Sequence, residues 1–470
     1  MTKIIRMHKP IDASDIVFFV SLLGDRCLTD IENLTKYGHD ETEDLQFPPD
    51  VVLKPETVEE VSEIMRYAFE KSIIVTPSGA RTGLSGGALP VKKGIALSME
   101  RFNKILSIDE KNHQVTTEPG VITEVLQNAV KEQGLFYPPD PASKGSCFIG
   151  GNVAENSGGP KAVKYGVTKD YVLNLEVVLP NGDVIWTGAN VIKNATGYNL
   201  TQLIVGSEGT LAIITKIVLH LIPHPTTDLL MLVPFFDAEK ACEAVAAIFR
   251  AGITPSGLEF MERDALIYTQ QFINEDSVQI GENHAAHLLI EVDGFDNELL
   301  MQDCEKIMSV LENFETDEIL FAESQDQKDS LWKIRRKCGE AVKAQSIYKE
   351  EDTVVPRYEL PKVLRHVKQL GQIYGFKSVC YGHAGDGNLH INILKGELTD
   401  DQWDTELPKA IRELFTEIVK LGGTISGEHG IGLVQKPYMD IAFSEVSLNL
   451  MREIKNVFDP KGILNPHKIF

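Results

Sequence analysis

The chain has 470 residues, 43% of them hydrophobic, and this length excludes a single compact core because domains usually hold ~100 to 200 residues. Its formal net charge of −22 argues against nucleic acid or an anionic membrane surface as a partner, since both would be repelled. The six cysteines are scattered and form no CxxC run, which argues against an iron–sulfur cluster or a zinc ribbon and fits a cytosolic protein.

The N-terminal apolar stretch "IVFFVSLLG" is short, and Asp12 and Asp15 stand before it. A signal peptide would carry basic residues there and a small-residue cleavage site afterwards, so we interpret the stretch as a buried helix. No apolar run approaches the ~20 residues of a membrane span. We therefore expect no transmembrane segment and a cytoplasmic protein, with peripheral attachment to a membrane as the alternative.

An α/β unit opens the first half of the chain. Residues 51–79 predict a strand, a helix and a strand, because Thr57 and Glu60 have the spacing of a capping box and apolar residues recur at helical spacing behind them. Further on, Asn181-Gly182 joins two β-rich runs and predicts a tight hairpin. A last apolar strand ends at two prolines near residue 225. We therefore expect a first domain over 1–225.

The following segment alternates strands and helices. Its β-rich runs are "LLMLVPFF", "SGLEFME", "HLLIEVDG" and "EILFAES". Helical patterns open at Asp237 and lie near 296–313, 324–345, 360–375 and 402–421. These patterns predict a second domain over 226–425, built as a sheet covered by helices, and a C-terminal segment over 426–470.

Three glycine-rich loops interrupt the first domain. They read "PSGARTGLSGGALP" (77–90), "DPASKGSCFIGGNVAENSGG" (140–159) and "GSEGT" (206–210). Glycines let successive backbone N–H groups converge on an anion such as a pyrophosphate. The spacing matches neither GxGxxG nor the P-loop, and for the first loop alone an ordinary turn is an equal alternative. Three such loops in one domain favour contacts to a long cofactor, with the backbone of the second loop lying flat against it.

The stretch "YGHAGDGNLHIN" (381–392) predicts a hairpin with a histidine at each end of a glycine-rich turn. His383 and His390 can then point to one spot, and period-2 alternation puts Asn392 on the face of His390 and two isoleucines on the core face. "SGEHGIG" adds Glu428 and His429. Two imidazoles and a carboxylate suit zinc, and also manganese or iron(II). The alternative is a set of structural histidines without metal.

Six motifs in order resemble the FAD-linked oxidases of the p-cresol methylhydroxylase and vanillyl-alcohol oxidase superfamily. They are the three glycine loops, "GHAGDGNLH", "SGEHGIG" and "DPKGILNP". Within it the chain resembles the D-2-hydroxyacid dehydrogenase branch, with D-lactate dehydrogenase, the FAD subunit of glycolate oxidase and D-2-hydroxyglutarate dehydrogenase. The resemblance implies an α+β fold: a two-subdomain FAD-binding domain of the p-cresol methylhydroxylase type, a cap domain with an antiparallel sheet covered by helices, and a C-terminal segment that returns to the FAD domain.

The resemblance also implies residues for the FAD. Those expected at the pyrophosphate are Ser78, Gly79, Arg81, Thr82, Gly83 and Ser85. Those expected along the ribityl chain and flavin are Ser143, Gly145, Ser146, Gly150, Asn152 and Asn156, with Glu208 and Ile213 nearer the adenosine and Asn465 near the isoalloxazine. Neither the 78–90 loop nor the 138–160 loop contains a histidine, so we expect non-covalent FAD.

For the second site the resemblance implies metal ligands, a base and substrate contacts. The ligands are His383, His390 and Glu428, and His429 is the general base and a substrate contact. Arg335, which follows a tryptophan by three residues, is expected to bind the substrate carboxylate, and Asn392 is a further contact. Lys349 is a second candidate cation, with a less secure alignment. The alternative for Arg335 is a solvated cationic helix face.

The implied reaction is FAD-dependent oxidation of a D-2-hydroxy acid, D-lactate first, to the 2-oxo acid. Hydride passes to flavin N5 while the metal activates the hydroxyl and a histidine takes its proton. D-2-hydroxyglutarate and glycolate are alternative substrates. A non-redox enzyme that resembles alkylglycerone-phosphate synthase and a non-catalytic electron-relay subunit are alternative classes. Electrons would leave to a quinone, a cytochrome, an electron-transfer flavoprotein or an iron–sulfur subunit, and a homodimer is compatible with all of these readings.

Overall fold

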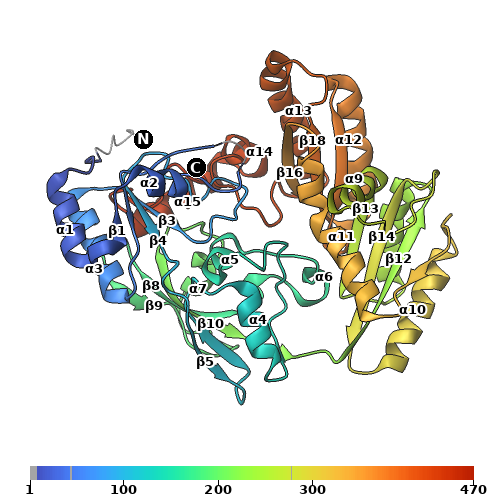
Figure 1. The fold of residues 1–470 in the computed structure, drawn as a ribbon, viewed down its shortest axis with the longest axis horizontal. Coiled ribbons are helices and arrows are strands. Elements are labelled where there is room, and N and C mark those ends of the chain that lie inside the picture. Colours follow the sequence, from blue (N-terminus) through green and yellow to red (C-terminus); the bar gives the residue numbers. More distant parts are fainter. Residues whose placement is uncertain (1–7, 43–44, 277) are drawn as a thin grey trace. The chain divides into compact units, whose positions relative to one another are not determined.

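The computed structural model describes residues 8–42, 45–276 and 278–470 (Figure 1). The chain divides into two compact units, which are taken one at a time below. Unit 1 comprises Met1–Ser157, Val167–His224 and Glu428–Phe470, and unit 2 comprises Gly158–Gly166 and Pro225–Gly427. Nothing in the sequence pattern indicated that 158–166, inside the second glycine-rich loop, folds with unit 2. The three-domain division expected from the sequence stays a prediction.

The first sheet of unit 1 has the order β1-β2-β4-β3, and β2, β4 and β3 run parallel. A parallel pair needs a crossover, which the helix between β2 and β3 provides. Helices α1 and α3 bury apolar side chains against this sheet in one core that includes Phe19, Ile64 and Met65. The elements are α1 (Ala13–Leu23), β1 (Cys27–Leu28), α2 (Ile31–Tyr37), β2 (Val51–Leu53), α3 (Val58–Lys71), β3 (Val75–Ser78) and β4 (Ile95–Ser98).

The predicted capping box at the start of α3 forms only in part. The Thr57 hydroxyl accepts the N–H of Glu60 at 3.2 Å. The Glu60 carboxylate accepts instead from the N–H of Glu56 and from the Arg26 guanidinium, at 2.7 Å and 2.6 Å. The Glu60 carboxylate that would have accepted the N–H of Thr57 in a capping box is thus bound by Arg26 and by the N–H of Glu56.

The second sheet of unit 1 is antiparallel with the order β5-β6-β10-β8-β9. The predicted hairpin at Asn181-Gly182 is confirmed: β8 pairs with β9, and Gly182 has a φ of +90°. The elements are β5 (Ile105–Asp109), β6 (Gln114–Thr117), α4 (Thr123–Lys131), β7 (Leu135–Phe136), α5 (Ile149–Glu155), β8 (Val172–Val178), β9 (Val184–Trp186), α7 (Leu200–Ile204), β10 (Ile213–His220) and β11 (Ile222–Pro223).

The second glycine loop is not a loop throughout, because its central part forms the helix α5. That its backbone lies flat against a long cofactor stays a prediction. Gly150 allows this helix to approach the preceding loop, because a Cβ at this position would lie 2.5 Å from the Cβ of Pro119. This glycine therefore serves close helix packing.

The C-terminal segment of the chain folds with unit 1. It contains α14 (Met439–Ala442) and α15 (Glu445–Phe458). The tail then runs beside β3, where Leu464 forms a parallel bridge with Val75 and the Asn465 N–H donates to the carbonyl of Val75 at 2.8 Å. The expected return of the C-terminal segment to the FAD-binding domain is therefore confirmed.

Unit 2 is built on a seven-stranded antiparallel sheet with the order β15-β12-β14-β13-β17-β18-β16. Figure 1 shows α9 and α11 on one side of this sheet and α10 and α12 on the other, as expected for a covered sheet. The elements are α6 (Ala162–Tyr165), β12 (Thr227–Phe235), α8 (Ala238–Arg250), β13 (Gly257–Glu262), α9 (Arg263–Ile273), β14 (Ala286–Gly294), α10 (Asn297–Leu311), β15 (Leu320–Phe321), α11 (Gln325–Lys343), β16 (Tyr348–Val354), α12 (Leu360–Tyr374), β17 (Lys377–Gly382), β18 (Asn388–Leu394) and α13 (Asp400–Lys420).

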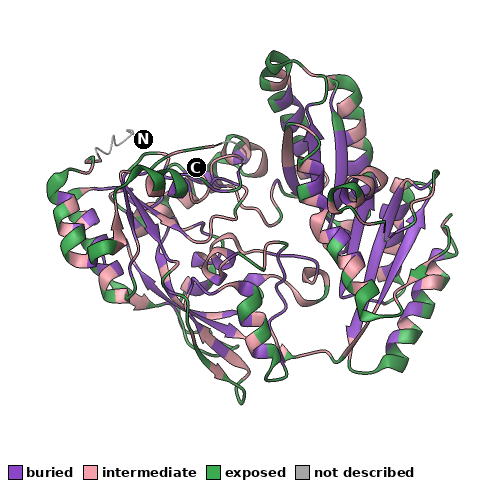
Figure 2. Cartoon of the chain, viewed as in Figure 1, coloured by how far each residue is buried: buried purple, intermediate pink, exposed green. Residues whose placement is uncertain are grey.

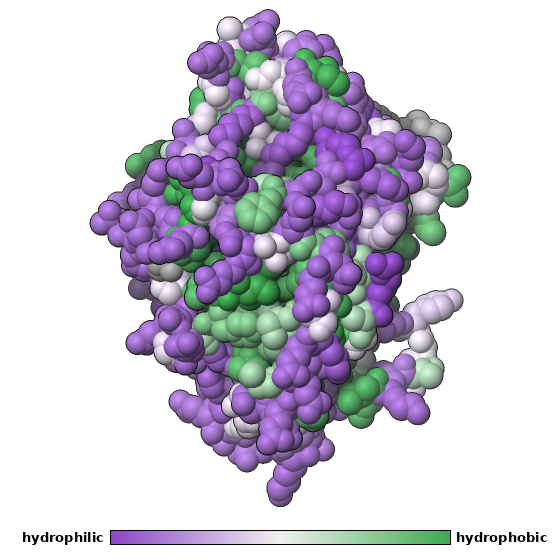
Figure 3. All heavy atoms as spheres, turned by 90° about the vertical axis from the view of Figure 1, so that its right-hand side faces the viewer, coloured by the Kyte–Doolittle hydropathy of each residue, from purple (hydrophilic) through white to green (hydrophobic). Residues whose placement is uncertain are grey.

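The face of the unit 2 sheet under α9 and α11 is partly apolar and partly charged. Its apolar part is one core that includes Leu289, Met261 and Val379 from the strands and Ile334 and Val342 from α11. Figure 2 shows the strands of this sheet buried and the exposed residues confined largely to the helices. Seen from the side of α10 and α12, the surface is largely hydrophilic, with apolar side chains gathered near its centre (Figure 3).

The short segment 158–166 is tied to β14 by ion pairs. Lys161 pairs with Glu291, and the Lys164 ammonium lies 2.6 Å from the Asp293 carboxylate. The Tyr165 hydroxyl donates to Asp293 at 2.7 Å. These contacts explain why this segment belongs to unit 2. Among the residues that the structure describes, no helix has the length and apolarity of a membrane span.

Candidate active site

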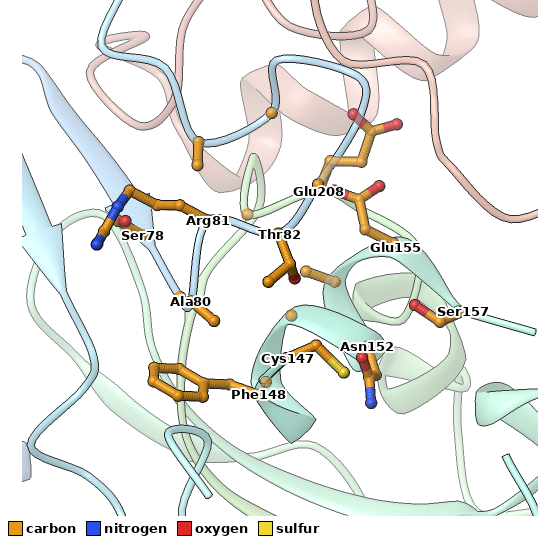
Figure 4. Close-up of a pocket in the computed structure, with 18 of the residues that line it drawn as sticks. Ser78, Ala80, Arg81, Thr82, Cys147, Phe148, Asn152, Glu155, Ser157 and Glu208 are labelled. Atoms are coloured by element: carbon orange, nitrogen blue, oxygen red, sulfur yellow. The ribbon is translucent and has the colours of Figure 1, made fainter. Parts of the chain in front are cut away.

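Unit 1 contains a cavity of about 270 Å³ that is partly open to solvent. The first and second glycine loops, the end of the third, and the start of the C-terminal segment line it (Figure 4). Ten of the residues expected to bind FAD lie on its wall: Ser78, Gly79, Arg81, Thr82, Gly83, Ser143, Gly150, Asn152, Glu208 and Ile213. Residues on the wall that the sequence did not indicate include Asp40, Cys147, Phe148 and Glu155.

Two glycines on this wall are not explained by the packing of the protein itself. A Cβ at Gly83 or Gly151 would meet no atom within 4 Å, and neither residue has a positive φ. Two polar atoms nearby are buried without a hydrogen-bond partner among the described residues, Ser78 Oγ and Arg81 Nη1. Open space beside backbone and unsatisfied donors fit an anionic ligand that lies against these loops. The residues present therefore fit FAD.

Five residues expected at the FAD are not on the cavity wall. Gly145 and Ser146 are exposed. Asn156 ends α5 in the left-handed region, with a φ of 57°, and its side chain accepts the N–H of Lys169. Asn465 is buried and donates to the carbonyls of Gly87 and Glu208 at 3.1 Å and 2.8 Å.

The fifth, Ser85, is also buried, and its backbone carbonyl accepts the N–H of Leu433 at 2.7 Å. Asn465 and Ser85 therefore join the glycine loops to the C-terminal segment, which places them behind the wall that a ligand would touch.

Glu208, expected near the adenosine, bonds within the protein. Its carboxylate accepts the N–H groups of Ile431 and Gly432 at 2.8 Å and 2.6 Å. Burial raises the pKa of Glu208 to about 7. Figure 4 shows it beside Glu155, whose pKa is raised well above its usual range by burial and then by Glu208. Glu208 therefore holds the loop that follows His429.

Glu428 and His429 both line the unit 1 cavity. They precede the turn at Gly430, which has a φ of +81° and leaves no room for a Cβ beside the Glu155 carboxylate. A side chain at this position would be strained by its backbone and would collide with a buried acid. The glycines of "SGEHGIG" thus bring the backbone of this segment against the acids of the cavity.

In unit 2 the predicted hairpin is confirmed, with β17 and β18 antiparallel and Tyr381 opposite His390. The rings of His383 and His390 have centroids 5.4 Å apart, and a ring nitrogen of each lies within 4.8 Å of the other. Every residue of β18 is buried, so the face that holds His390 and Asn392 is an interior polar face.

Glu259 is the carboxylate partner of His383. Its two oxygens lie 3.0 Å and 2.8 Å from His383 Nδ1, and Arg335 Nε lies 2.7 Å from one of them. Burial alone would raise the pKa of Glu259, but His383 and Arg335 lower it. An ionised Glu259 accepts a hydrogen bond, so Nδ1 of His383 carries the proton and Nε2 offers its lone pair.

Arg335 is not on a solvated helix face. It is 5% exposed, its guanidinium lies 5.3 Å from the Tyr381 ring centre, and its charge is paired with Glu259. The alternative considered from the sequence is therefore wrong. Lys333 on the same helix does face solvent, and it pairs with Glu275 at 2.5 Å at the surface.

A second group of charges surrounds His390. Its Nδ1 lies 3.8 Å from Glu350 and 3.9 Å from Asp352. Glu350 is paired with Lys343 at 2.8 Å. Asp352 accepts from the side chain of Asn388 at 2.6 Å and from the N–H of Gly427 at 2.8 Å. Among the described residues whose contacts with this cluster are given above, the polar face holds two cations, Arg335 and Lys343, and three carboxylates, Glu259, Glu350 and Asp352.

Lys349 stands apart from this face. It is opposite Ile393 in the pairing of β16 with β18, whereas Glu350 is opposite Asn392 and Asp352 is opposite His390. Opposed residues share a face, and neighbours along a strand alternate. Lys349 therefore projects from the other side of the sheet.

Comparison with known proteins gives the family. The family described as "FAD linked oxidases, C-terminal domain" matches residues 224–469, which is more than half of the chain. The chain belongs to the FAD-linked oxidase family. The family described as "FAD binding domain" also matches, over residues 49–188. The predicted resemblance is thus confirmed, and this FAD-linked oxidase is an oxidoreductase with FAD as its cofactor.

Curated relatives cover nearly the whole oxidase. The chain is 38% identical to the glycolate oxidase subunit GlcD of Bacillus subtilis, over 92% of each protein. It is 37% identical to a D-lactate dehydrogenase of Anaerostipes hadrus, over 90% of this chain and 89% of the relative. It is 33% identical to a D-2-hydroxyglutarate dehydrogenase of Stutzerimonas stutzeri, over 95% and 96%.

Solved structures support the fold of the oxidase. A p-cresol methylhydroxylase superposes with a TM-score of 0.78 at 19% identity, over 99% of this chain and 98% of that one. An alkyldihydroxyacetonephosphate synthase superposes with a TM-score of 0.74 at 18% identity, over 99% and 87%. Both confirm the predicted α+β architecture.

Proposed function

We propose that this oxidase converts a D-2-hydroxy acid, D-lactate foremost, into the 2-oxo acid. The observation that carries the proposal is the position of His429 on the wall of the same cavity as the glycine loops. The three relatives named above are named for glycolate, D-lactate and D-2-hydroxyglutarate. Each of these acids has a hydroxyl group next to a carboxylate, so we infer this group for the substrate here.

We propose that FAD lies non-covalently against the glycine loops. Ser78, Gly79 and Gly83 would face its pyrophosphate, while Gly150 and Asn152 would face the remainder. Asn152 is fixed by a hydrogen bond from its amide to the Thr123 hydroxyl at 2.6 Å. Bound FAD supplies the acceptor for the two electrons that leave the substrate.

We propose His429 as the general base. Oxidation of a secondary alcohol to a ketone requires that the hydroxyl proton leave as the Cα–H bond breaks. An imidazole nitrogen on the cavity wall can accept that proton. The Glu208 carboxylate holds the backbone two and three residues further on, which fixes the segment from which His429 projects.

We propose a divalent metal ion with His383, His390 and Glu428 as ligands, and zinc is the ion that this donor set suits best, with manganese or iron as alternatives. The bond from His383 to Glu259 supports the proposal, because metal-binding histidines usually give their second N–H to a carboxylate. Glu428 follows Gly427 directly, and the N–H of Gly427 donates to Asp352, which lies opposite His390 in the strand pairing. A bound ion supplies positive charge that eases loss of the hydroxyl proton.

The charge balance of the polar face gives a second reason for a metal. Two cations against three carboxylates leave this face negative, and an anionic 2-hydroxy acid would be repelled by it. A divalent ion would reverse the sign. The face therefore suits an anion only when it is loaded with a cation.

We propose Arg335 and Asn392 as substrate contacts. A guanidinium has five N–H donors, and its ion pair with Glu259 does not use all of them. Asn392 lies on the polar face beside His390. Lys349 is left out, because its strand position turns it away from that face.

Electrons must finally leave the protein. All six cysteines are free and five of them are buried. They form no cluster site among the described residues, so we propose an external acceptor, such as a quinone, a cytochrome, an electron-transfer flavoprotein or an iron–sulfur protein.

The test is anaerobic reduction of the flavin in the purified protein. D-lactate, glycolate or D-2-hydroxyglutarate should bleach the flavin absorbance, and His429→Asn should retain FAD and lose the bleaching. His113→Asn is the matched control, because His113 lies in the left-handed region with a φ of 51°, which asparagine also adopts. Full bleaching by the His429→Asn protein would remove His429 from the base role, and no bleaching of the wild type would reject the reaction.

A further inference from the structure

The carboxylate of Glu350 lies on the polar face of unit 2, beside His390. It is opposite Asn392 in the strand pairing, and its Oε1 lies 3.8 Å from His390 Nδ1. Its side chain is only 9% exposed. An acid substrate bound near His390 and Asn392 would therefore have this carboxylate as a neighbour.

Two groups fix Glu350 in place. The Lys343 ammonium pairs with it at 2.8 Å, and the Tyr381 hydroxyl donates to it at 3.2 Å. Tyr381 is in turn held against α11, since its hydroxyl lies 3.0 Å from the position of a Cβ on Gly339. Because Lys343 is already paired with Glu350, the pair presents no net positive charge to an approaching second carboxylate.

The register of β16 decides which side chain occupies this place. A shift of one residue would bring Lys349 onto the polar face instead of Glu350. A lysine there would attract the distal carboxylate of a dicarboxylic substrate. The observed pairing of Lys349 with Ile393 puts an acid in that position.

We propose that Glu350 makes the site selective for 2-hydroxy acids that carry a single carboxylate. This inference rests on the proposed function, since it assumes that the hydroxy acid binds at His390 and Asn392. A second carboxylate on the substrate tail would lose its water beside Glu350 and would find the Lys343 ammonium already paired. A charge that is buried without a counter-ion lowers binding roughly tenfold or more. The substrate class that results is short monocarboxylic D-2-hydroxy acids.

The experiment compares Glu350→Gln with the wild type, both as full-length protein loaded with FAD and zinc. The readouts are the rates of anaerobic flavin bleaching by D-lactate and by D-2-hydroxyglutarate, and the dissociation constants of pyruvate and 2-oxoglutarate measured by calorimetry. Glu351→Gln is the matched control, because Glu351 is a buried carboxylate on the next residue that faces the other side of the sheet.

Glu350→Gln should raise the preference for the dicarboxylic acid over the monocarboxylic acid roughly tenfold in both readouts, while Glu351→Gln leaves it within twofold. An unchanged preference in Glu350→Gln, with D-lactate still bleaching the flavin, overturns the role of Glu350 and leaves the proposed reaction standing. A wild-type protein that prefers D-2-hydroxyglutarate also overturns it. Bleaching by none of the acids rejects the reaction itself, and the inference with it.

Discussion

The fit of FAD to the glycine loops can be tested by adding one methyl group. Gly151 lies within α5, lines the unit 1 cavity, and would place a Cβ where no protein atom is within 4 Å. The substitution Gly151→Ala therefore acts on the ligand and not on the protein's own packing. Its effects on folding and on binding should have opposite signs.

The magnitudes follow from helix propensity and from packing. Alanine is favoured over glycine in a helix by up to about 1 kcal/mol, so the protein stripped of FAD should be stabilised by up to that amount. A methyl group forced into a filled ligand site costs about 1–3 kcal/mol. That cost corresponds to FAD binding weaker by roughly 5- to 150-fold.

The assay is urea unfolding of the protein stripped of FAD, together with titration by FAD followed through flavin fluorescence. Gly150→Ala is the contrasting variant, because its Cβ would lie 2.5 Å from a Pro119 atom and should destabilise the protein even without FAD. Unweakened FAD binding by Gly151→Ala, in a protein that folds normally, would refute the placement of FAD against α5.

Three further outcomes test other parts of the structure. Gly430→Ala should destabilise the protein by about 1–3 kcal/mol and slow flavin bleaching, because the new side chain strains a left-handed residue and collides with Glu155. Gly24→Ala is the control, since Gly24 also has a positive φ but has empty space around it, so this variant should lose stability and keep its bleaching rate. Equal bleaching rates in the two variants would contradict the steric argument. Burial lowers the pKa of His287 to about 3. Below its ordinary pKa of about 6.5 the unfolded chain therefore binds a proton that the folded protein does not, and the free energy of unfolding should be about 2 kcal/mol lower at pH 5 than at pH 8. Urea unfolding of His287→Leu at the two pH values should not show this difference. Glu259→Gln should weaken zinc binding about 10- to 100-fold and leave the FAD content unchanged. Calorimetry and metal analysis measure both quantities. Unaltered zinc affinity would show that Glu259 is not what orients His383.

The helices of unit 2 could be predicted from the sequence because their start signals are local. Asp237, Asp296 and Ser324 each cap the helix that follows with a side-chain bond to its first N–H groups. A cap acts over three residues, and the apolar spacing behind it acts over one or two turns. Both signals are complete within the segment that they describe.

Strand β16 could not be predicted in the same way. Its central residues "KEEDT" read as an exposed polar segment, yet Glu351, Asp352 and Thr353 are buried. The strand forms because β18 supplies its hydrogen bonds and because a charged interior face accepts its acids. Local patterns fail where a buried face is polar for a functional reason.

The two sites differ in the kind of residue that lines them. The FAD cavity is lined largely by glycines, and a high glycine content is visible in the sequence whichever way the loops fold. The polar face is made of charges whose meaning depends on their partners. From the sequence, Arg335 is a full cation for a substrate, whereas the structure shows that part of its charge is taken up by Glu259, in a distant strand. A buried charge cannot be assigned an attraction or a repulsion before its counter-ions are known. A single sequence can therefore indicate a ligand site that is built from backbone. Substrate selectivity depends on the net charge of a cluster such as that around Glu350, and that charge is known only once the strand register is known.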